Sequence, residues 1–200
     1  LLAGIRNNGM NDQPVFYPFY KSIVQKVNPA ANEHINIPLD FKYVETAKIP
    51  VNESFENTNS FTLDIDGKPE TFIKPTTSMS ILGNYSGEVT LTSAIRFVEI
   101  ASAQSILAGE NGRGESYIEF DYKGEGEIAV GLAKFLNGNI NIEYFLFVPG
   151  RENWNKIYVE VTDKLSSQDY EKYNLLLAFS KTGNSEQSKI YVDNFKHVHY

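Results

Sequence analysis

The sequence predicts an all-β sandwich, and three observations support this fold class. After residue 50, the chain consists mostly of short runs in which apolar and polar residues alternate, as they do along half-buried strands. Turns rich in Gly and Asn separate these runs, at a spacing typical of sandwiches. Only the stretch SSQDYEKY (166–173) has the pattern of a helical turn, with Ser166 as its N-cap.

The first fifty residues differ from the rest, because prolines interrupt their extended runs and confine them to coil or edge strands. We therefore expect 1–50 to be an N-terminal extension or the end of a preceding module, and 51–200 to be the sandwich domain. We also expect Phe16, Tyr17 and Phe19 to be buried against that domain, since they would otherwise expose a large apolar patch.

The sandwich domain is predicted to contain roughly nine strands. The segment INIEYFLFV (140–148) is apolar on both faces and therefore predicts a central strand that is covered on both sides. The segment AIRFVEIASAQSILA (94–108) also fits a helical period, so its type stays open. The clearest expected strands are 61–66, 116–123, 126–136, 140–148, 155–165, 173–179 and 189–198.

The closing strand raises a question about one carboxylate. Strict alternation places Asp193 on the same face as Tyr191, Phe195 and His197, so that an acid lies between aromatic rings. We expect this strand to pair near the first strand of the domain, because a sandwich often brings its termini to one end. Asp193 would then lie close to the segment NESFE (52–56).

Composition excludes several classes of protein. A hydrophobic content of 42% and an aromatic content of 13% indicate a globular chain rather than a disordered one. The absence of cysteine excludes disulfides, thiol nucleophiles and cysteine-ligated metals. A net charge of −7 disfavours nucleic acid as a partner, because both are negatively charged. No apolar run is long enough to span a membrane.

Two neighbouring strands carry outward-pointing aromatic and acidic side chains. Sugars stack their C–H faces on aromatic rings, while carboxylates accept hydrogen bonds from their hydroxyls, so this mixture predicts a sugar-binding face. The alternative is burial of the same side chains beneath another segment. The residues concerned are Tyr117, Glu119, Asp121, Tyr158 and Glu160.

Trp154 follows a turn and starts a strand, and it is a further candidate ligand contact. The alternative, a structural ring at the edge of the sandwich, is what the family resemblance described below implies.

The carboxylates also require a test as a glycosidase pair, which would need two carboxyl groups ~5–10 Å apart. Glu115, Glu119 and Asp121 are close in sequence, but Lys123 follows on the same face and would keep them ionised. We therefore predict no catalytic residues.

Three stretches together resemble a known family: NESFE (52–56), ENWNKIYVEVTDKL (152–165) and KIYVDNFKHV (189–198). They are similar to the galactose-binding-like jelly rolls of many carbohydrate-binding modules. YPFY (17–20) and YIEFDYKGEGEIAVGL (117–132), with the tryptophan stretch, look more narrowly like an uncharacterised group of surface lipoproteins from gut Bacteroidetes. The resemblance implies export to the outer-membrane surface or periplasm, with a lipid anchor on a cysteine upstream of this chain.

The resemblance also implies a structural calcium ion, shared by a Glu of the first strand and an Asp of the last. The matching positions are Glu56 and Asp193, whereas Glu53 and Ser54 depart from the family pattern. The alternative is that Asp193 accepts hydrogen bonds from a loop or pairs with a lysine.

The sequence thus predicts a non-catalytic, exported glycan-binding module. A structural or protein-interaction domain of a surface assembly is the first alternative, and a glycoside hydrolase is the weaker one.

Overall fold

The structure is a computed structural model that describes residues 2–3, 20–21, 42–43, 48–57, 59–65, 73–107, 114–166 and 169–200. The chain divides into two compact units, Ile49–His199 and Leu1–Lys48 with Tyr200. In the latter unit, the described residues form a three-stranded sheet of very short strands: β1 (Leu2–Ala3), β2 (Tyr20–Lys21) and β3 (Lys42–Tyr43). The predicted burial of Phe16, Tyr17 and Phe19 falls outside the described residues.

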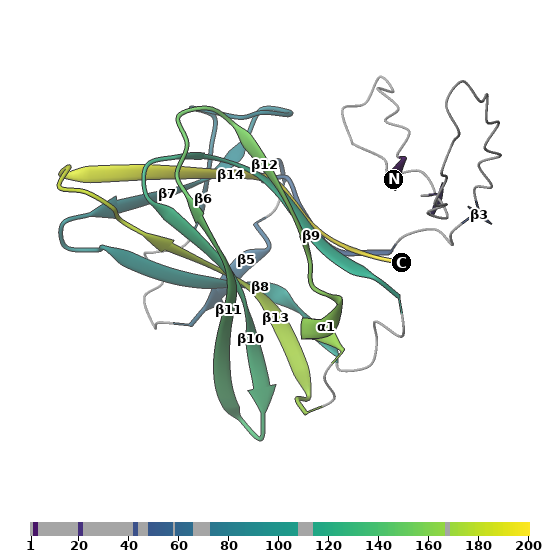
Figure 1. Ribbon diagram of the computed structural model, residues 1–200. Helices are drawn as coiled ribbons and strands as arrows, with labels where there is room; N and C mark the ends of the chain where they lie inside the picture. The colour runs from purple at the N-terminus through teal and green to yellow at the C-terminus, as the bar shows by residue number, and fades with distance from the viewer. Residues whose placement is uncertain are drawn as a thin grey trace, which may run out of the picture. The chain divides into compact units, whose positions relative to one another are not determined.

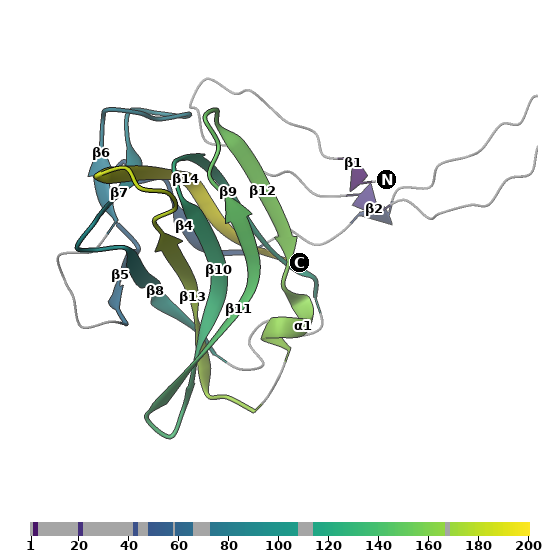
Figure 2. The ribbon, with the colours of Figure 1, turned by 60° about the vertical axis from the view of Figure 1, so that its left-hand side comes forward.

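The unit Ile49–His199 is built from two sheets (Figure 1). The five-stranded sheet has the order β11–β10–β13–β8–β5, and these strands lie side by side in Figure 2. Its strands are β5 (Phe61–Asp64), β8 (Phe97–Leu107), β10 (Glu127–Leu136), β11 (Asn139–Pro149) and β13 (Lys172–Ser180).

The six-stranded sheet has the order β12–β9–β14–β7–β6, and β4 also pairs with β14. Its strands are β4 (Lys48–Glu53), β6 (Lys74–Thr76), β7 (Ser86–Thr92), β9 (Ser116–Gly124), β12 (Asn155–Glu160) and β14 (Gln187–His199). The predicted pairing of the closing strand with the first strand of the domain is confirmed by the β4–β14 contact.

A single apolar core fills the space between the two sheets. Alternation places Ile118, Phe120 and Tyr122 of β9 inside, opposite Ile128 and other inward side chains of the five-stranded sheet. Packing one apolar face of each sheet against the other removes both from water, which is the main stabilisation of a sandwich. The predicted all-β jelly-roll sandwich is confirmed. In the part of the chain that is described, no helix is long and apolar enough to cross a membrane.

Strict alternation fails in β14, because a β-bulge lies between Asp193 and Lys196. Asn194 takes a positive φ of 51°, a conformation that asparagine tolerates better than most residues. Asp193 pairs with Asp121 and points away from the core, whereas Phe195 packs in the core, 4.8 Å from Phe61 between ring centroids. The prediction that Asp193 shares a face with Phe195 and His197 is therefore wrong.

Two other expectations are corrected. Segment 140–148 lies in β11, which is an edge strand and not a central one. The helical turn is α1 (Thr162–Leu165), one turn before the predicted position, and Ser166 is its C-cap instead of an N-cap. The ambiguous segment 94–108 contributes the strand β8.

Candidate functional site

The sheet registers bring the predicted sugar-binding residues together on the outer face of the six-stranded sheet, the face turned away from the core. Tyr158 of β12 lies opposite Glu119 of β9, and Glu160 lies opposite Tyr117. Directly paired residues point to the same side of a sheet. Tyr158 is 63% exposed and Glu160 is exposed, so both are open to a ligand.

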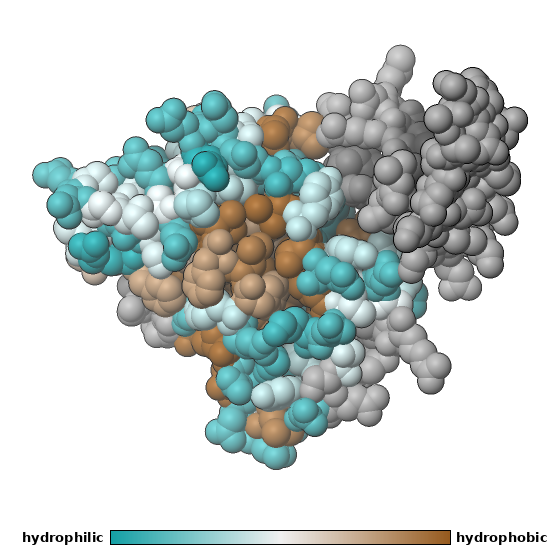
Figure 3. All heavy atoms as spheres, viewed as in Figure 1, coloured by the Kyte–Doolittle hydropathy of each residue, from teal (hydrophilic) through white to brown (hydrophobic). Residues whose placement is uncertain are grey.

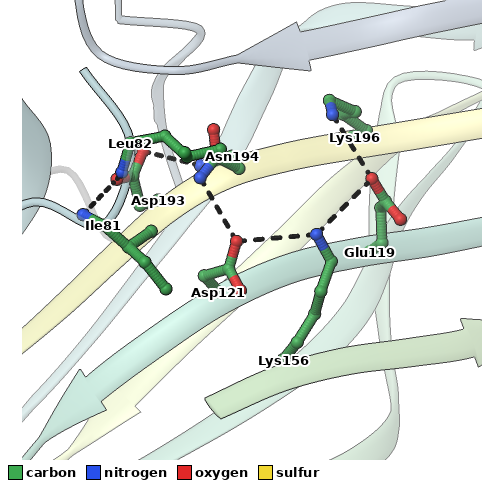
Figure 4. Close-up of polar contacts among 8 residues, drawn as sticks. All are labelled: Ile81, Leu82, Glu119, Asp121, Lys156, Asp193, Asn194 and Lys196. Atoms are coloured by element: carbon green, nitrogen blue, oxygen red, sulfur yellow. Dashed lines mark hydrogen bonds and ion pairs between the residues drawn. The ribbon is translucent and has the colours of Figure 1, made fainter. Parts of the chain in front are cut away.

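The two carboxylates of this face are buried and already engaged (Figure 4). Glu119 Oε1 lies 3.4 Å from Lys196 Nζ and 3.9 Å from Lys156 Nζ. Asp121 Oδ2 lies 3.6 Å from Lys156 Nζ and accepts a hydrogen bond of 3.2 Å from Asn194 Nδ2. These groups compensate one another's charge, as buried charges require.

Tyr117 and Trp154 complete the predicted set. Tyr117 is half-buried and donates its hydroxyl proton to Glu115 Oε2 at 2.9 Å. Burial and that acceptor raise the pKa of Tyr117 to about 12. Trp154 is half-buried in the turn before β12. Whether these residues contact a ligand stays a prediction.

Asp193 and Glu56 hold one loop, the segment between β6 and β7. Asp193 Oδ2 accepts backbone N–H groups from Ile81 (3.1 Å) and Leu82 (3.4 Å), and Oδ1 accepts that of Asn194 (2.8 Å) (Figure 4). Glu56 Oε1 accepts the N–H groups of residues 84 and 85 at 2.7 and 2.8 Å. Burial raises the pKa of Asp193 to about 6, outweighing these three hydrogen bonds.

This arrangement bears on the calcium prediction. The groups around Asp193 are N–H donors, which suit a carboxylate and repel a cation. Within the described residues, no group of three or more His, Cys, Asp or Glu side chains is placed to hold a metal ion. The hydrogen-bonding alternative thus describes the observed contacts, and a calcium ion at Glu56 and Asp193 stays a prediction.

The outer face of the five-stranded sheet carries a second set of candidate residues, which sequence reasoning missed. Phe147 of β11 lies opposite Ala129 of β10, Ala129 opposite Ala178 of β13, and Ala178 opposite Glu99 of β8. We call these four residues the Phe147 row. Phe147 is 59% exposed beside two alanines that are nearly buried, so its ring stands above a floor of small side chains.

Rows on either side extend this face. On one side Glu127 pairs with Ser180, and Ser180 pairs with Phe97, which is 42% exposed. On the other side Tyr144 pairs with Gly131, which pairs with Leu176. One side of the Phe147 row therefore combines the polar residues Glu127 and Ser180 with the exposed ring of Phe97, and the other side is formed by Tyr144, Gly131 and Leu176.

A bulge in the β10–β11 pairing turns two rings of β11 to the same face. The register shifts between Val130 and Gly131, so that Tyr144 and Phe147 both point outward although they are three positions apart. Their ring centroids are 5.9 Å apart, and the rings are tilted by 51°. Bulges commonly re-aim side chains near functional sites.

Figure 3 shows an apolar patch near the centre of the view, where the edge strands β11 and β12 run. Partly buried core residues lie on these two strands, namely Phe145, Leu146, Ile157 and Val159. The sequence signal for β11 was its apolar stretch FLFV (145–148), which predicted a central strand covered on both faces.

Comparisons with known proteins support the fold. No protein-family model matches the sequence, and no curated protein matches it. The structure is similar to the C-terminal family 22 carbohydrate binding module of Clostridium thermocellum Xyn10B, with a TM-score of 0.54 and 10% identity, over 76% of this chain and 92% of that one. It is also similar to the CBM22-2 xylan-binding domain from Paenibacillus barcinonensis Xyn10C, with a TM-score of 0.51 and 14% identity, over 75% and 99%.

Proposed function

We propose that the sandwich is a non-catalytic glycan-binding module, and that its ligand lies on the outer face of the five-stranded sheet. The Phe147 row carries this proposal. An exposed ring stands beside two alanines, and a carboxylate closes the row on β8.

The chemistry of that row suits a sugar. The C–H face of a pyranose ring packs against the exposed Phe147 ring, next to the small side chains of Ala129 and Ala178. Glu99, Glu127 and Ser180 lie on or next to the row and offer acceptors and a hydroxyl for the sugar hydroxyls. A few polar groups beside an apolar surface are typical of small-ligand sites.

The structural neighbours favour the same class of ligand. One of them is named as a xylan-binding domain, and the other as a carbohydrate binding module with a ligand-binding cleft. Xylan is therefore the first glycan to test.

The outer face of the six-stranded sheet is the second candidate. Its exposed Tyr158 lies beside Glu160, which is the arrangement that the sequence predicted. Against it, Glu119 and Asp121 are held by lysines and leave fewer groups to contact a ligand.

Matched substitutions separate the two faces. In affinity gel electrophoresis with xylan, we expect Phe147→Ala to lose most of the retardation that the parent protein shows. Its melting temperature should match that of the parent, because the ring is mostly exposed. We expect Tyr158→Ala to bind like the parent protein. Loss of binding in Tyr158→Ala alone would place the ligand on the other face, and no retention on xylan or on a broad glycan array would refute the proposed function.

The absence of catalysis is part of the proposal. The carboxylates of Glu119 and Asp121 are engaged by the ammonium groups of Lys196 and Lys156, so neither is free to act on a glycosidic bond, whereas a glycosidase needs two carboxyl groups that flank that bond. Release of reducing sugar from a bound glycan would contradict this part.

The exported, lipid-anchored setting rests on the sequence resemblance alone and remains a proposal. Radiolabelled palmitate incorporated into the protein in its native cell would support it, and unlabelled protein in the cytoplasmic fraction would refute it.

A further inference from the structure

Among the described residues, the outer face of the five-stranded sheet holds one buried hydroxyl without a hydrogen-bond partner. The Tyr144 hydroxyl is buried, and no group among the described residues accepts its proton or donates to it. An unsatisfied buried hydroxyl destabilises the folded state, so native structures seldom retain one without a role. The rest of the Tyr144 ring is only half-buried, so part of the residue reaches the surface.

The backbone is shaped to accept this ring. A Cβ atom at Gly131 would lie 3.0 Å from Tyr144 Cδ1 and 2.5 Å from the carbonyl oxygen of Glu143. Glycine at this position therefore lets the ring lie close against β10. The bulge then sets the ring beside Phe147, the exposed residue to which we assign the sugar.

The surroundings of Tyr144 are otherwise apolar. Its cluster on the outer face consists of buried Ala101, Ala133 and Leu176, with partly buried Leu63 and Ile142 among the side chains packed against them. A sugar hydroxyl placed here would leave water and find only one donor, at a net cost. A methyl group would be favourable but would leave the Tyr144 hydroxyl unsatisfied.

We propose that this cluster recognises an acetyl substituent on the bound glycan, with the Tyr144 hydroxyl donating to the acetyl carbonyl oxygen. This inference rests on the proposed glycan binding at Phe147 and specifies its ligand class. An acetyl group combines a methyl, which suits the alanine and leucine side chains, with a carbonyl acceptor, which matches the Tyr144 hydroxyl that has no partner among the described residues. Leu63 and Ile142 of this cluster are only partly buried, so the cluster extends to the surface of the protein.

The test compares one glycan in two chemical forms. Partially acetylated xylan and the same sample after alkaline deacetylation are titrated calorimetrically into the parent protein, Tyr144→Phe and Tyr158→Phe. We expect the parent and Tyr158→Phe to bind the acetylated form about fivefold more tightly, which is the effect of one net hydrogen bond. We expect Tyr144→Phe to bind both forms equally and to melt no lower than the parent, because it loses only an unsatisfied hydroxyl.

Each other outcome is decisive. Equal binding of both forms by the parent overturns the acetyl inference and leaves the proposed function standing. A preference that survives in Tyr144→Phe, or disappears in Tyr158→Phe, overturns the role of Tyr144. If the parent binds neither form of xylan and none of a broad set of acetylated glycans, the proposed function and the inference are both overturned.

Discussion

The two sheets use their outer faces differently. The outer face of the six-stranded sheet buries charged side chains that neutralise one another, such as Glu119 with Lys196. That of the five-stranded sheet carries alanines, a glycine, exposed rings and one hydroxyl that has no partner in the part of the chain that the structure describes. In a sequence, an outward carboxylate beside an aromatic ring suggests a binding site. On the six-stranded sheet, however, such carboxylates are paired with lysines of neighbouring strands. Because exposed rings occur on both faces, with Tyr158 on one and Phe147 on the other, the unsatisfied hydroxyl of Tyr144 is the feature that distinguishes them among the described residues.

The largest expected effect lies in the charged cluster. Lys196→Met should leave Glu119 with only the more distant Lys156, and should destabilise the fold by about 3–5 kcal/mol, because a buried charge loses its partner. Lys189→Met, which breaks an exposed pair with Glu88, serves as control and should cost at most about 1 kcal/mol. Chemical denaturation measures both, and equal small losses would mean that the cluster is not structurally important.

A smaller loss is expected on the apolar face. Gly131→Ala places a methyl group 2.5 Å from the carbonyl oxygen of Glu143, so β10 and β11 must separate locally, at a cost of about 1–3 kcal/mol. Tyr144 and Phe147 should shift with β11, which should weaken glycan binding as well. A variant with parent-like melting temperature and binding would show that the close approach at Gly131 is unimportant.

Two titrating groups of β14 should make opposite contributions to the pH dependence of stability. The pKa of Asp193 is raised to about 6 by burial, so its contribution is complete below pH 3.8 and is lost as the pH rises to about 6. The pKa of His197, buried in the core, is lowered to about 4, so its contribution is complete above pH 6.5 and is lost as the pH falls to about 4.

Single variants should reveal each contribution. Relative to the parent, Asp193→Asn should gain stability as the pH rises from 4 to 6. His197→Met should gain stability as the pH falls from 6.5 to 4. Thermal melts across this range measure both differences, and curves that run parallel to the parent's would contradict the assignments.

Much of the fold was predictable because alternation is a local property. Strands such as β9 and β12 follow it without interruption, and their residues occupy the predicted faces. The bulges were not predictable, because one extra residue leaves little trace in a sequence. The bulge after Asp193 reversed the predicted face of Phe195, and the bulge at Gly131 brought Tyr144 and Phe147 together.

The candidate residues on the five-stranded sheet were not predicted, for a related reason. Strand β11 was misassigned because its sequence pattern is that of a central strand. It is an edge strand that packs on the core with one face and carries apolar groups on the other. Burial of Glu119 and Asp121 depends on Lys156 of β12 and Lys196 of β14, which are far from them in sequence.

The most direct test of the central claim is a nuclear magnetic resonance titration of the isotope-labelled protein with a glycan that it binds. We predict that the largest amide shift changes will fall at Phe97, Ala129, Phe147 and Ala178, whose strands form the outer face of the five-stranded sheet. Changes concentrated instead around Tyr117, Tyr158 and Glu160 would contradict the account and place the ligand on the six-stranded sheet.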